Sequence, residues 1–165
     1  MQGMKVEIIE PHGMCAGVNA AIAKALKLKD VWCLHELVHN EIVIGELKDL
    51  GFKFVERIED VPEGETVVFS AHGVSPAVRL AAKERNLKVV DTTCPFVAKV
   101  HKAAKAFAEK GLPVVILGDP RHVEVRGIRG EVDCNRSQST AIDKPPAPNL
   151  DRNRKARLFP IDGNG

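Results

Sequence analysis

The sequence predicts an α/β fold in which βαβ units build a mostly parallel sheet. One unit recurs along the 165 residues: a short apolar run, a polar loop that carries Cys or His, and an amphipathic stretch with helical periodicity. Apolar runs of this length, separated by helical stretches, indicate parallel strands joined by helices. The chain is long enough to bury a core of its own.

The elements follow one another in a regular order. Strands are expected at 6–9, 31–34, 66–69, 87–90 and 113–117, and helices at 18–28, 41–50, 76–85 and 96–110. Gly51 and Gly111 follow two of these helices, at the position where glycine commonly ends a helix. Right-handed crossovers would bring the carboxyl ends of all the strands to one edge of the sheet.

Residues 135–165 have a different composition. They hold four of the ten prolines, many charged and amide side chains, and no periodic apolar face. Such a segment buries too little surface to offset chain entropy, so we expect disorder. Its basic stretch, 152–157, could contact an acidic partner, although a solvated tail is the favoured interpretation.

Overall composition argues against two classes of partner. The net charge of +2 is too small to indicate nucleic-acid or membrane binding. No stretch approaches the roughly 20 consecutive apolar residues of a membrane span, and the first ten residues lack the apolar core of a secretory signal. We therefore expect a cytoplasmic protein.

Five chemically capable side chains each lie just after an apolar run, and they are Cys15, His39, His72, Cys94 and His122. Ligands of open α/β sheets bind outside the carboxyl ends of the strands. These residues are therefore expected to converge in space although they are distant in sequence.

Two of the four cysteines have the surroundings of a functional thiolate. Cys15 stands between glycines, which allow close approach of a bulky group. Cys94 precedes Pro95, which favours the first helical position, so Cys94 is expected to cap a helix whose N-terminus stabilises thiolate. The alternative is that both are small buried hydrophobes. Cys33 is expected in the core, and Cys134 is assigned no role.

The three loop histidines, His39, His72 and His122, could together hold a phosphate or diphosphate by charge-assisted hydrogen bonds. Taken singly, each histidine is better explained as structural, as we expect for His101, whereas the convergent set favours a functional role. Glu124 lies two residues after His122, and in an extended chain both side chains would share a face. It could then serve as a proton donor, or it could be an ordinary surface glutamate.

Residues 35–39 also match the H-E-x-x-H signature of zinc proteases through His35, Glu36 and His39. That signature requires a helix and a further ligand. The segment follows a predicted strand directly, and Asn40 is placed to cap a helix that starts only at Glu41. A zinc hydrolase is therefore the weaker alternative.

Taken together and in this order, the motifs resemble the 4-hydroxy-3-methylbut-2-enyl diphosphate reductase family. The matching stretches are GMCAGV at 13–18, HELVHN at 35–40, FSAHGVS at 69–75, DTTCPFV at 91–97 with KVH at 99–101, and more weakly HVEVRG at 122–127. The resemblance covers about residues 4 to 133.

The resemblance implies a specific chemistry. Family members have three α/β lobes around a [4Fe–4S] cluster held by three cysteines, of which Cys15 and Cys94 match two. His39, His72 and His122 match the residues that hold the substrate diphosphate, and Glu124 matches the acid. The reaction removes the allylic hydroxyl as water and gives isopentenyl and dimethylallyl diphosphate, with electrons from a ferredoxin- or flavodoxin-like carrier. Residues 1–93 would form the first lobe and 94–134 the start of the second.

The chain departs from the family pattern in two respects. Val123 and Arg126 stand where the family usually has proline and glutamate. No residue in 135–165 matches the third cysteine, so we expect a truncated, frame-shifted or fragmentary chain with impaired activity. A remnant that binds a phosphate-bearing ligand without a cluster is a further alternative.

Overall fold

Four parallel strands form the central sheet, so the predicted α/β class is confirmed. The computed structural model describes residues 7, 12–133 and 140–142 of the chain. The strands pair in the order β2-β1-β3-β4, and their bounds are β1 (Trp32–Leu34), β2 (Lys53–Val55), β3 (Thr66–Phe69) and β4 (Lys88–Asp91).

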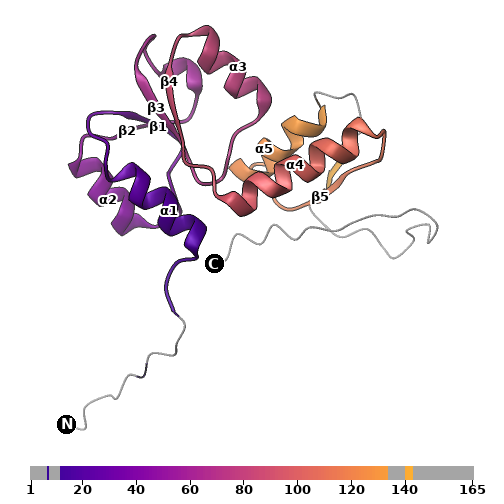
Figure 1. Cartoon of the computed structure of the whole chain (residues 1–165), viewed down its shortest axis with the longest axis horizontal. Helices are drawn as coiled ribbons and strands as arrows, with labels where there is room; N and C mark the ends of the chain where they lie inside the picture. The colour runs from indigo at the N-terminus through magenta and orange to yellow at the C-terminus, as the bar shows by residue number, and fades with distance from the viewer. Residues whose placement is uncertain (1–6, 8–11, 134–139, 143–165) are drawn as a thin grey trace.

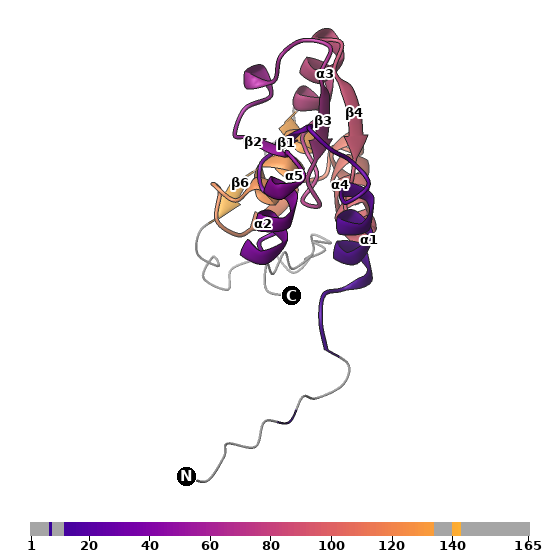
Figure 2. The ribbon, with the colours of Figure 1, turned by 90° about the vertical axis from the view of Figure 1, so that its left-hand side faces the viewer.

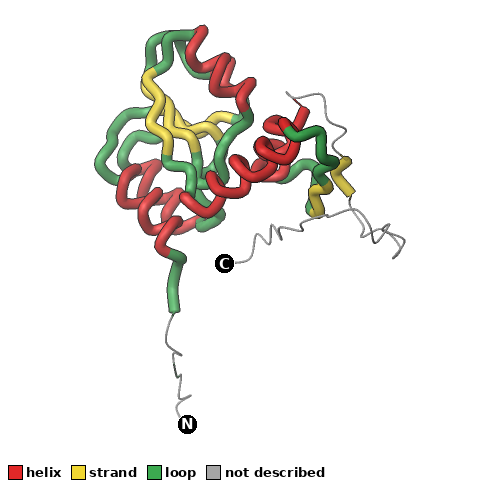
Figure 3. The backbone as a smooth tube through the Cα atoms, turned by 45° about the vertical axis from the view of Figure 1, so that its right-hand side comes forward, coloured by secondary structure: helices red, strands yellow, loops and turns green. Residues whose placement is uncertain are grey.

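Helices cover both faces of this sheet (Figures 1 and 3). Helices α1 (Ala16–Ala25) and α2 (Glu41–Asp49) pack on one face, in a core that includes Cys33 and Val68. The 3₁₀ helix η1 (Ile58–Asp60) and helix α3 (Pro76–Glu84) pack on the other face, around Leu34 and Phe69. Successive strand residues point to opposite faces, which is why Cys33 and Leu34 belong to different cores.

The direction of winding changes between β1 and β3. Strand β1 continues through α2 to β2 on one side of the sheet, whereas β3 continues through α3 to β4 on the other. Leu34 and Phe69 are register partners, so the loops that follow β1 and β3 start at the same level. Such a switch point opens a crevice at the carboxyl ends of the strands, where α/β proteins bind ligands.

A further group of elements lies to one side of the central sheet in Figure 1 and behind it in the turned view of Figure 2. It comprises α4 (Pro95–Glu109), β5 (Val115–Leu117), α5 (Val123–Asp133) and β6 (Thr140–Ile142). Its core includes Ala104, Ile116 and Ile128 and is separate from the cores of the sheet. The lobe boundaries at residues 93 and 134 stay a prediction.

The structure differs from the predictions in three places. Strand β2 and helix α5 were not predicted. Residues 140–142 pair in parallel with β5, so the expectation of disorder is wrong for these three residues. The rest of 135–165, Cys134, and residues 6, 8 and 9 of the first predicted strand lie outside the described residues.

In the part of the chain that the structure describes, no helix combines the length and the apolar character needed to cross a membrane.

Candidate functional site

His39 ends the loop that follows β1. Directly after the strand, His35 adopts a φ of +61°, which turns the chain away from the sheet. The loop stops where the Asn40 side chain accepts hydrogen bonds from the backbone N–H groups of Ile42 and Val43, each at 3.1 Å. Because this cap starts α2 at Glu41, His39 is left immediately outside the helix with an exposed side chain.

His72 lies in the loop that follows β3, residues 70–75. The N–H of Gly73 donates to the Ser70 carbonyl at 3.1 Å and closes a tight turn around His72. The φ of Gly73 is +75°, a conformation that favours glycine. The loops after β1 and β3 are joined by a hydrogen bond from the Ala71 N–H to the Leu37 carbonyl at 3.1 Å.

His122 immediately precedes α5. Its Nδ1 accepts a hydrogen bond from the backbone N–H of Glu124 at 3.3 Å, so the imidazole serves as the cap of this helix. An Nδ1 that accepts carries no proton, and the neutral ring therefore has its N–H at Nε2. This Nε2 lies 3.3 Å from Nε2 of His39.

The three imidazoles form one group, which we call the histidine cluster (His39, His72 and His122). The ring centroids are 4.4 Å apart for His39 and His72, 5.3 Å for His39 and His122, and 5.8 Å for His72 and His122. The predicted convergence of these residues is thus observed in the structure. Three N–H donors so close together, beside the start of a helix, suit an anion with several oxygens.

The surroundings disfavour protonation of two members of this cluster, His72 and His122. Burial, followed by the charges of His39 and His122, lowers the pKa of His72 to about 4. Burial and the neighbouring His39 also lower the pKa of His122, although Asp119 opposes the effect. These two imidazoles resist protonation because each charge would be poorly solvated and near another. A bound anion would offset both penalties.

Glu124 lies beside the histidine cluster, but not for the reason expected. It belongs to the first turn of α5 and not to an extended segment, so the argument from a shared strand face is wrong. Its half-buried position raises its pKa, and the nearby His39 partly offsets this effect. A carboxyl group with a raised pKa retains its proton to higher pH, as a proton donor requires.

Cys15 and Cys94 both occupy the position that caps a helix. Cys15 precedes α1 and is exposed, and Cys94 precedes α4 and is buried. A Cβ atom at Gly17 would collide with Sγ of Cys94 and lie 3.5 Å from its Cβ, so the start of α1 packs directly on Cys94. The Cys94 N–H donates to the Ala71 carbonyl at 2.9 Å, which links this region to the loop that carries His72.

These two cysteines suit an iron–sulfur cluster in their chemistry but do not complete its ligand set. Both stand at helix N-termini, and the absence of a side chain at Gly17 lets the start of α1 pack against the sulfur of Cys94. Among the described residues, no group of three or more His, Cys, Asp or Glu side chains could hold a metal. A third cysteine ligand would have to come from outside them.

The zinc-protease geometry is absent from this segment. Residues 35–40 are not helical, and α2 begins at Glu41 as the Asn40 cap predicts. Nδ1 of His35 lies 3.0 Å from a Glu56 oxygen, whereas His39 belongs to the histidine cluster. Cys33 is fully buried, as expected, and burial raises its pKa to about 12.

His101 and Glu131 form a buried pair of which only the histidine was predicted. His101, expected to be structural, is 6% exposed and lies with Nδ1 3.1 Å from Oε1 of Glu131. Ala104 and Ala108 mark the same buried face of α4, so helical periodicity places His101 inward. Nothing in the sequence pattern singled out Glu131, because α5 was not predicted.

Comparisons with known proteins show the family of this chain. The family model described as LytB protein matches residues 6–159, which extends past residue 133, where we expected the resemblance to end. The chain belongs to the LytB family. Members of this family are iron–sulfur enzymes.

Similar curated LytB proteins carry the name 4-hydroxy-3-methylbut-2-enyl diphosphate reductase. The protein of Actinobacillus succinogenes is 45% identical over 135 residues, covering 79% of this chain and 43% of that protein. The protein of Vibrio cholerae is 43% identical over 147 residues, covering 86% of this chain and 46% of that protein. The chain therefore spans less than half the length of these curated relatives.

Solved structures of LytB enzymes share the fold. The E-1-hydroxy-2-methyl-but-2-enyl-4-diphosphate reductase of Plasmodium falciparum matches with a TM-score of 0.74 and 36% identity, over 81% of this chain and 43% of that one. A structure of (E)-4-hydroxy-3-methyl-but-2-enyl diphosphate reductase, described as the terminal enzyme of the non-mevalonate pathway, has a TM-score of 0.70, 32% identity and coverage of 82% and 50%.

Proposed function

We propose that this chain provides the diphosphate-binding part of a reductase site for 4-hydroxy-3-methylbut-2-enyl diphosphate. The observation that carries the proposal is the histidine cluster, with centroid separations of 4.4 to 5.8 Å, beside Glu124 at the switch point of the sheet. The names of the similar LytB proteins support the same substrate. The products would be isopentenyl and dimethylallyl diphosphate.

The imidazoles would bind the diphosphate as N–H donors. The hydrogen bond into Nδ1 of His122 leaves its Nε2–H free of the helix and directed toward His39. The start of α5 adds the partial positive charge of a helix N-terminus. Binding of the anion would favour the protonated imidazoles, so the low pKa of His72 would rise on binding.

Glu124 would supply the proton with which the allylic hydroxyl leaves as water. Its raised pKa extends the pH range over which the carboxyl group keeps its proton. Its place in the first turn of α5, two residues from His122, keeps it next to the bound diphosphate. A proton donor held beside the anion site is what an elimination of this kind requires.

Cys15 and Cys94 are the candidate ligands of an iron–sulfur cluster. When bound, such a cluster would supply two electrons and a Lewis-acidic iron. The electrons would come from a ferredoxin- or flavodoxin-like carrier, and a cytoplasmic location remains our prediction. Two cysteines do not enclose a cubane cluster alone, so the proposal requires a third ligand from outside the described residues.

Anaerobic purification of the full chain, followed by iron, sulfide and zinc analysis and a substrate-binding titration, tests the proposal. We expect iron and sulfide in equal amounts, and saturable binding of the allylic diphosphate that is lost in His39→Ala. Zinc in place of iron would favour the hydrolase alternative. Diphosphate binding without metal would indicate the cluster-less remnant, and no diphosphate binding would refute the proposal.

A further inference from the structure

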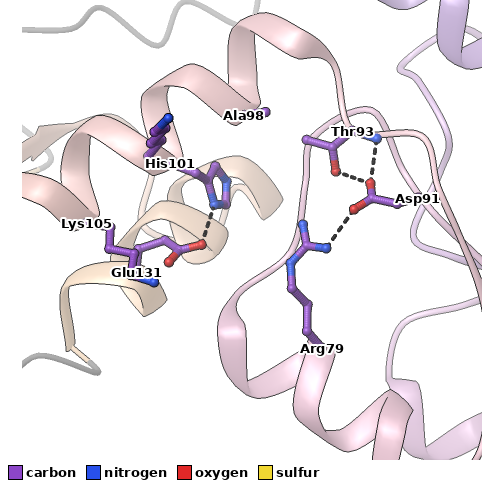
Figure 4. Close-up of a pocket in the computed structure, with 8 residues that line it drawn as sticks. Arg79, Asp91, Thr93, Ala98, His101, Lys105 and Glu131 are labelled. Carbon is purple, nitrogen blue, oxygen red and sulfur yellow. Dashed lines mark hydrogen bonds and ion pairs between the residues drawn. The ribbon is translucent and has the colours of Figure 1, made fainter.

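His101 does more than fill the core. Its Nδ1 is held by Glu131 of α5 at 3.1 Å, with side-chain exposures of 8% for His101 and 12% for Glu131. Its Nε2 is buried and has no hydrogen-bond partner among the residues that the structure describes. Figure 4 shows the ring beside Glu131, at the edge of a surface cavity of about 420 Å³ that Arg79, Asp91 and Thr93 line on the other side. A buried imidazole anchored at one nitrogen has a fixed orientation.

The free edge of that ring occupies a narrow space between two glycines, which we call the glycine slot (Gly73 and Gly127). A Cβ atom at Gly73 would lie 3.0 Å from Nε2 of His101, and one at Gly127 would lie 3.1 Å from its Cε1. Neither glycine could carry a side chain without displacing the imidazole. The ring therefore packs directly against the backbone on both sides.

The two walls of the glycine slot belong to the segments that carry His72, on one side, and His122 and Glu124, on the other. Gly73 follows His72 in the loop after β3, whereas Gly127 lies three residues after Glu124 in α5. The backbones of the two walls also approach each other directly, because a Cβ atom at Gly127 would lie 3.6 Å from the Gly73 carbonyl oxygen. One helical turn further, a Cβ atom at Gly130 would collide with the Ser75 side chain. The imidazole thus sets how closely α5 approaches this loop.

We propose that His101 is a positioning residue, whose imidazole in the glycine slot fixes the distance between His72 on the loop and His122 and Glu124 at the start of α5. The inference rests on the proposed function, because it takes the histidine cluster to be the diphosphate site. His101 itself does not contact the substrate; the histidine cluster and Glu124 do. It acts through the backbone that carries them, and Glu131 acts by orienting it.

Two substitutions at His101 separate its hydrogen bond with Glu131 from its filling of the glycine slot. In His101→Asn the amide N–H can still donate to Glu131, but the side chain is too short to fill the glycine slot. In His101→Gln the side chain reaches into the slot. As a control, Ile116→Ala weakens the core that α4, α5 and β5 share without touching the slot. The readouts, made on the full chain, are the pKa of His72 from imidazole NMR and the dissociation constant for inorganic pyrophosphate.

We expect His101→Asn to raise the pKa of His72 from about 4 toward its ordinary value, and to weaken pyrophosphate binding about tenfold. His101→Gln should restore both in part, and Ile116→Ala should lower thermal stability while leaving both unchanged in the folded protein. The proposal is overturned if His101→Asn and Ile116→Ala give the same pKa for His72. If the unsubstituted chain fails to bind pyrophosphate, the proposed function falls, while the pKa of His72 still decides the positioning role.

Discussion

At the scale of single residues, the protonation of His72 links the site to pH. Burial and two neighbouring imidazoles hold its pKa near 4, so the ring is neutral around pH 7 in the free protein. A bound diphosphate stabilises the imidazolium and raises that pKa. Ligand binding and proton uptake are therefore coupled.

This coupling predicts that pyrophosphate binds more tightly as the pH falls from about 7.5 to about 6, by up to about tenfold per pH unit for each proton taken up. Calorimetric titrations in two buffers of different ionisation enthalpy measure the proton uptake directly. His72→Gln should reduce the uptake. Equal apparent enthalpies in both buffers would show that no proton accompanies binding.

The contact between Gly17 and Cys94 gives a second residue-level prediction. Gly17→Ala should destabilise the fold by about 1–3 kcal/mol, because the added methyl group collides with the Cys94 sulfur in a packed core. Gly45→Ala is the matched control, since Gly45 is inside α2 and an added methyl group there would meet no neighbouring side chain within 4 Å. That change should be neutral or stabilising by up to about 1 kcal/mol. Urea unfolding of both variants measures the difference, and equal stabilities would contradict the contact.

At the scale of elements, the Asn40 cap determines where the loop of His39 ends. Asn40→Ala should lower the free energy of unfolding by about 1 kcal/mol, because two backbone N–H groups of α2 lose their acceptor. Asn40→Asp keeps the acceptor and should restore most of the stability. Thermal denaturation monitored by circular dichroism compares the variants. A loss in Asn40→Asp as large as that in Asn40→Ala would show that the cap is not the cause.

The sequence allows most of the sheet to be predicted, because β1, β3 and β4 are apolar runs and their helices have clear signals. Asn40 marks the start of α2, and Pro95 marks the start of α4. Helix α5 has no such signals. It carries two glycines and three valines, which favour other conformations, and packing of the glycine face against Ser75 and His101 stabilises it instead.

Because helix α5 was not predicted, only part of the site could be predicted. The convergence of His39, His72 and His122 followed from the common edge of a parallel sheet, which needs only strand order and handedness. The position of Glu124 depends on α5 being helical, so the argument from an extended chain reached the right residue for the wrong reason. The pairing of His101 with Glu131 is a contact between helices, and residue periodicity alone does not specify a partner.

At the scale of the whole molecule, the low pKa of His72 makes folding sensitive to acid. The unfolded chain binds a proton near pH 6.5, whereas the folded chain resists it until about pH 4. Since the unfolded state binds more protons in this interval, the free energy of unfolding falls as the pH falls through it. Hydrogen bonds to Arg121 lower the pKa of Asp119 to about 2, so this carboxyl group acts in the same sense but only below its ordinary pKa of 3.8.

We therefore predict that stability declines between about pH 6.5 and about pH 4, and that His72→Gln removes most of this decline. Urea unfolding at several pH values in this interval measures the slope. If the free energy of unfolding of His72→Gln changes with pH as steeply as that of the unsubstituted chain, a group other than His72 is responsible for the decline.

The whole molecule also brings three distant segments to one place, and the proposed diphosphate site requires all three. Three segments meet at the switch point of the sheet: the loop after β1, the loop after β3 and the residue before α5. The Nε2 atoms of His39 and His122 lie within hydrogen-bonding distance there. Helix α3 starts near the switch point and runs back antiparallel to the strands. Its C-terminal end therefore lies at the opposite edge of the sheet. Amides there provide an internal reference that a ligand at the switch point should not perturb.

Titration of the full chain with inorganic pyrophosphate, followed by imidazole and amide NMR, tests this claim most directly. We predict that the resonances of His39, His72 and His122 shift together, saturate with a single dissociation constant, and leave the amides at the end of α3 unchanged. Resonances of the histidine cluster that stay in place at saturating pyrophosphate, or that shift with three unrelated affinities, would contradict a shared diphosphate site.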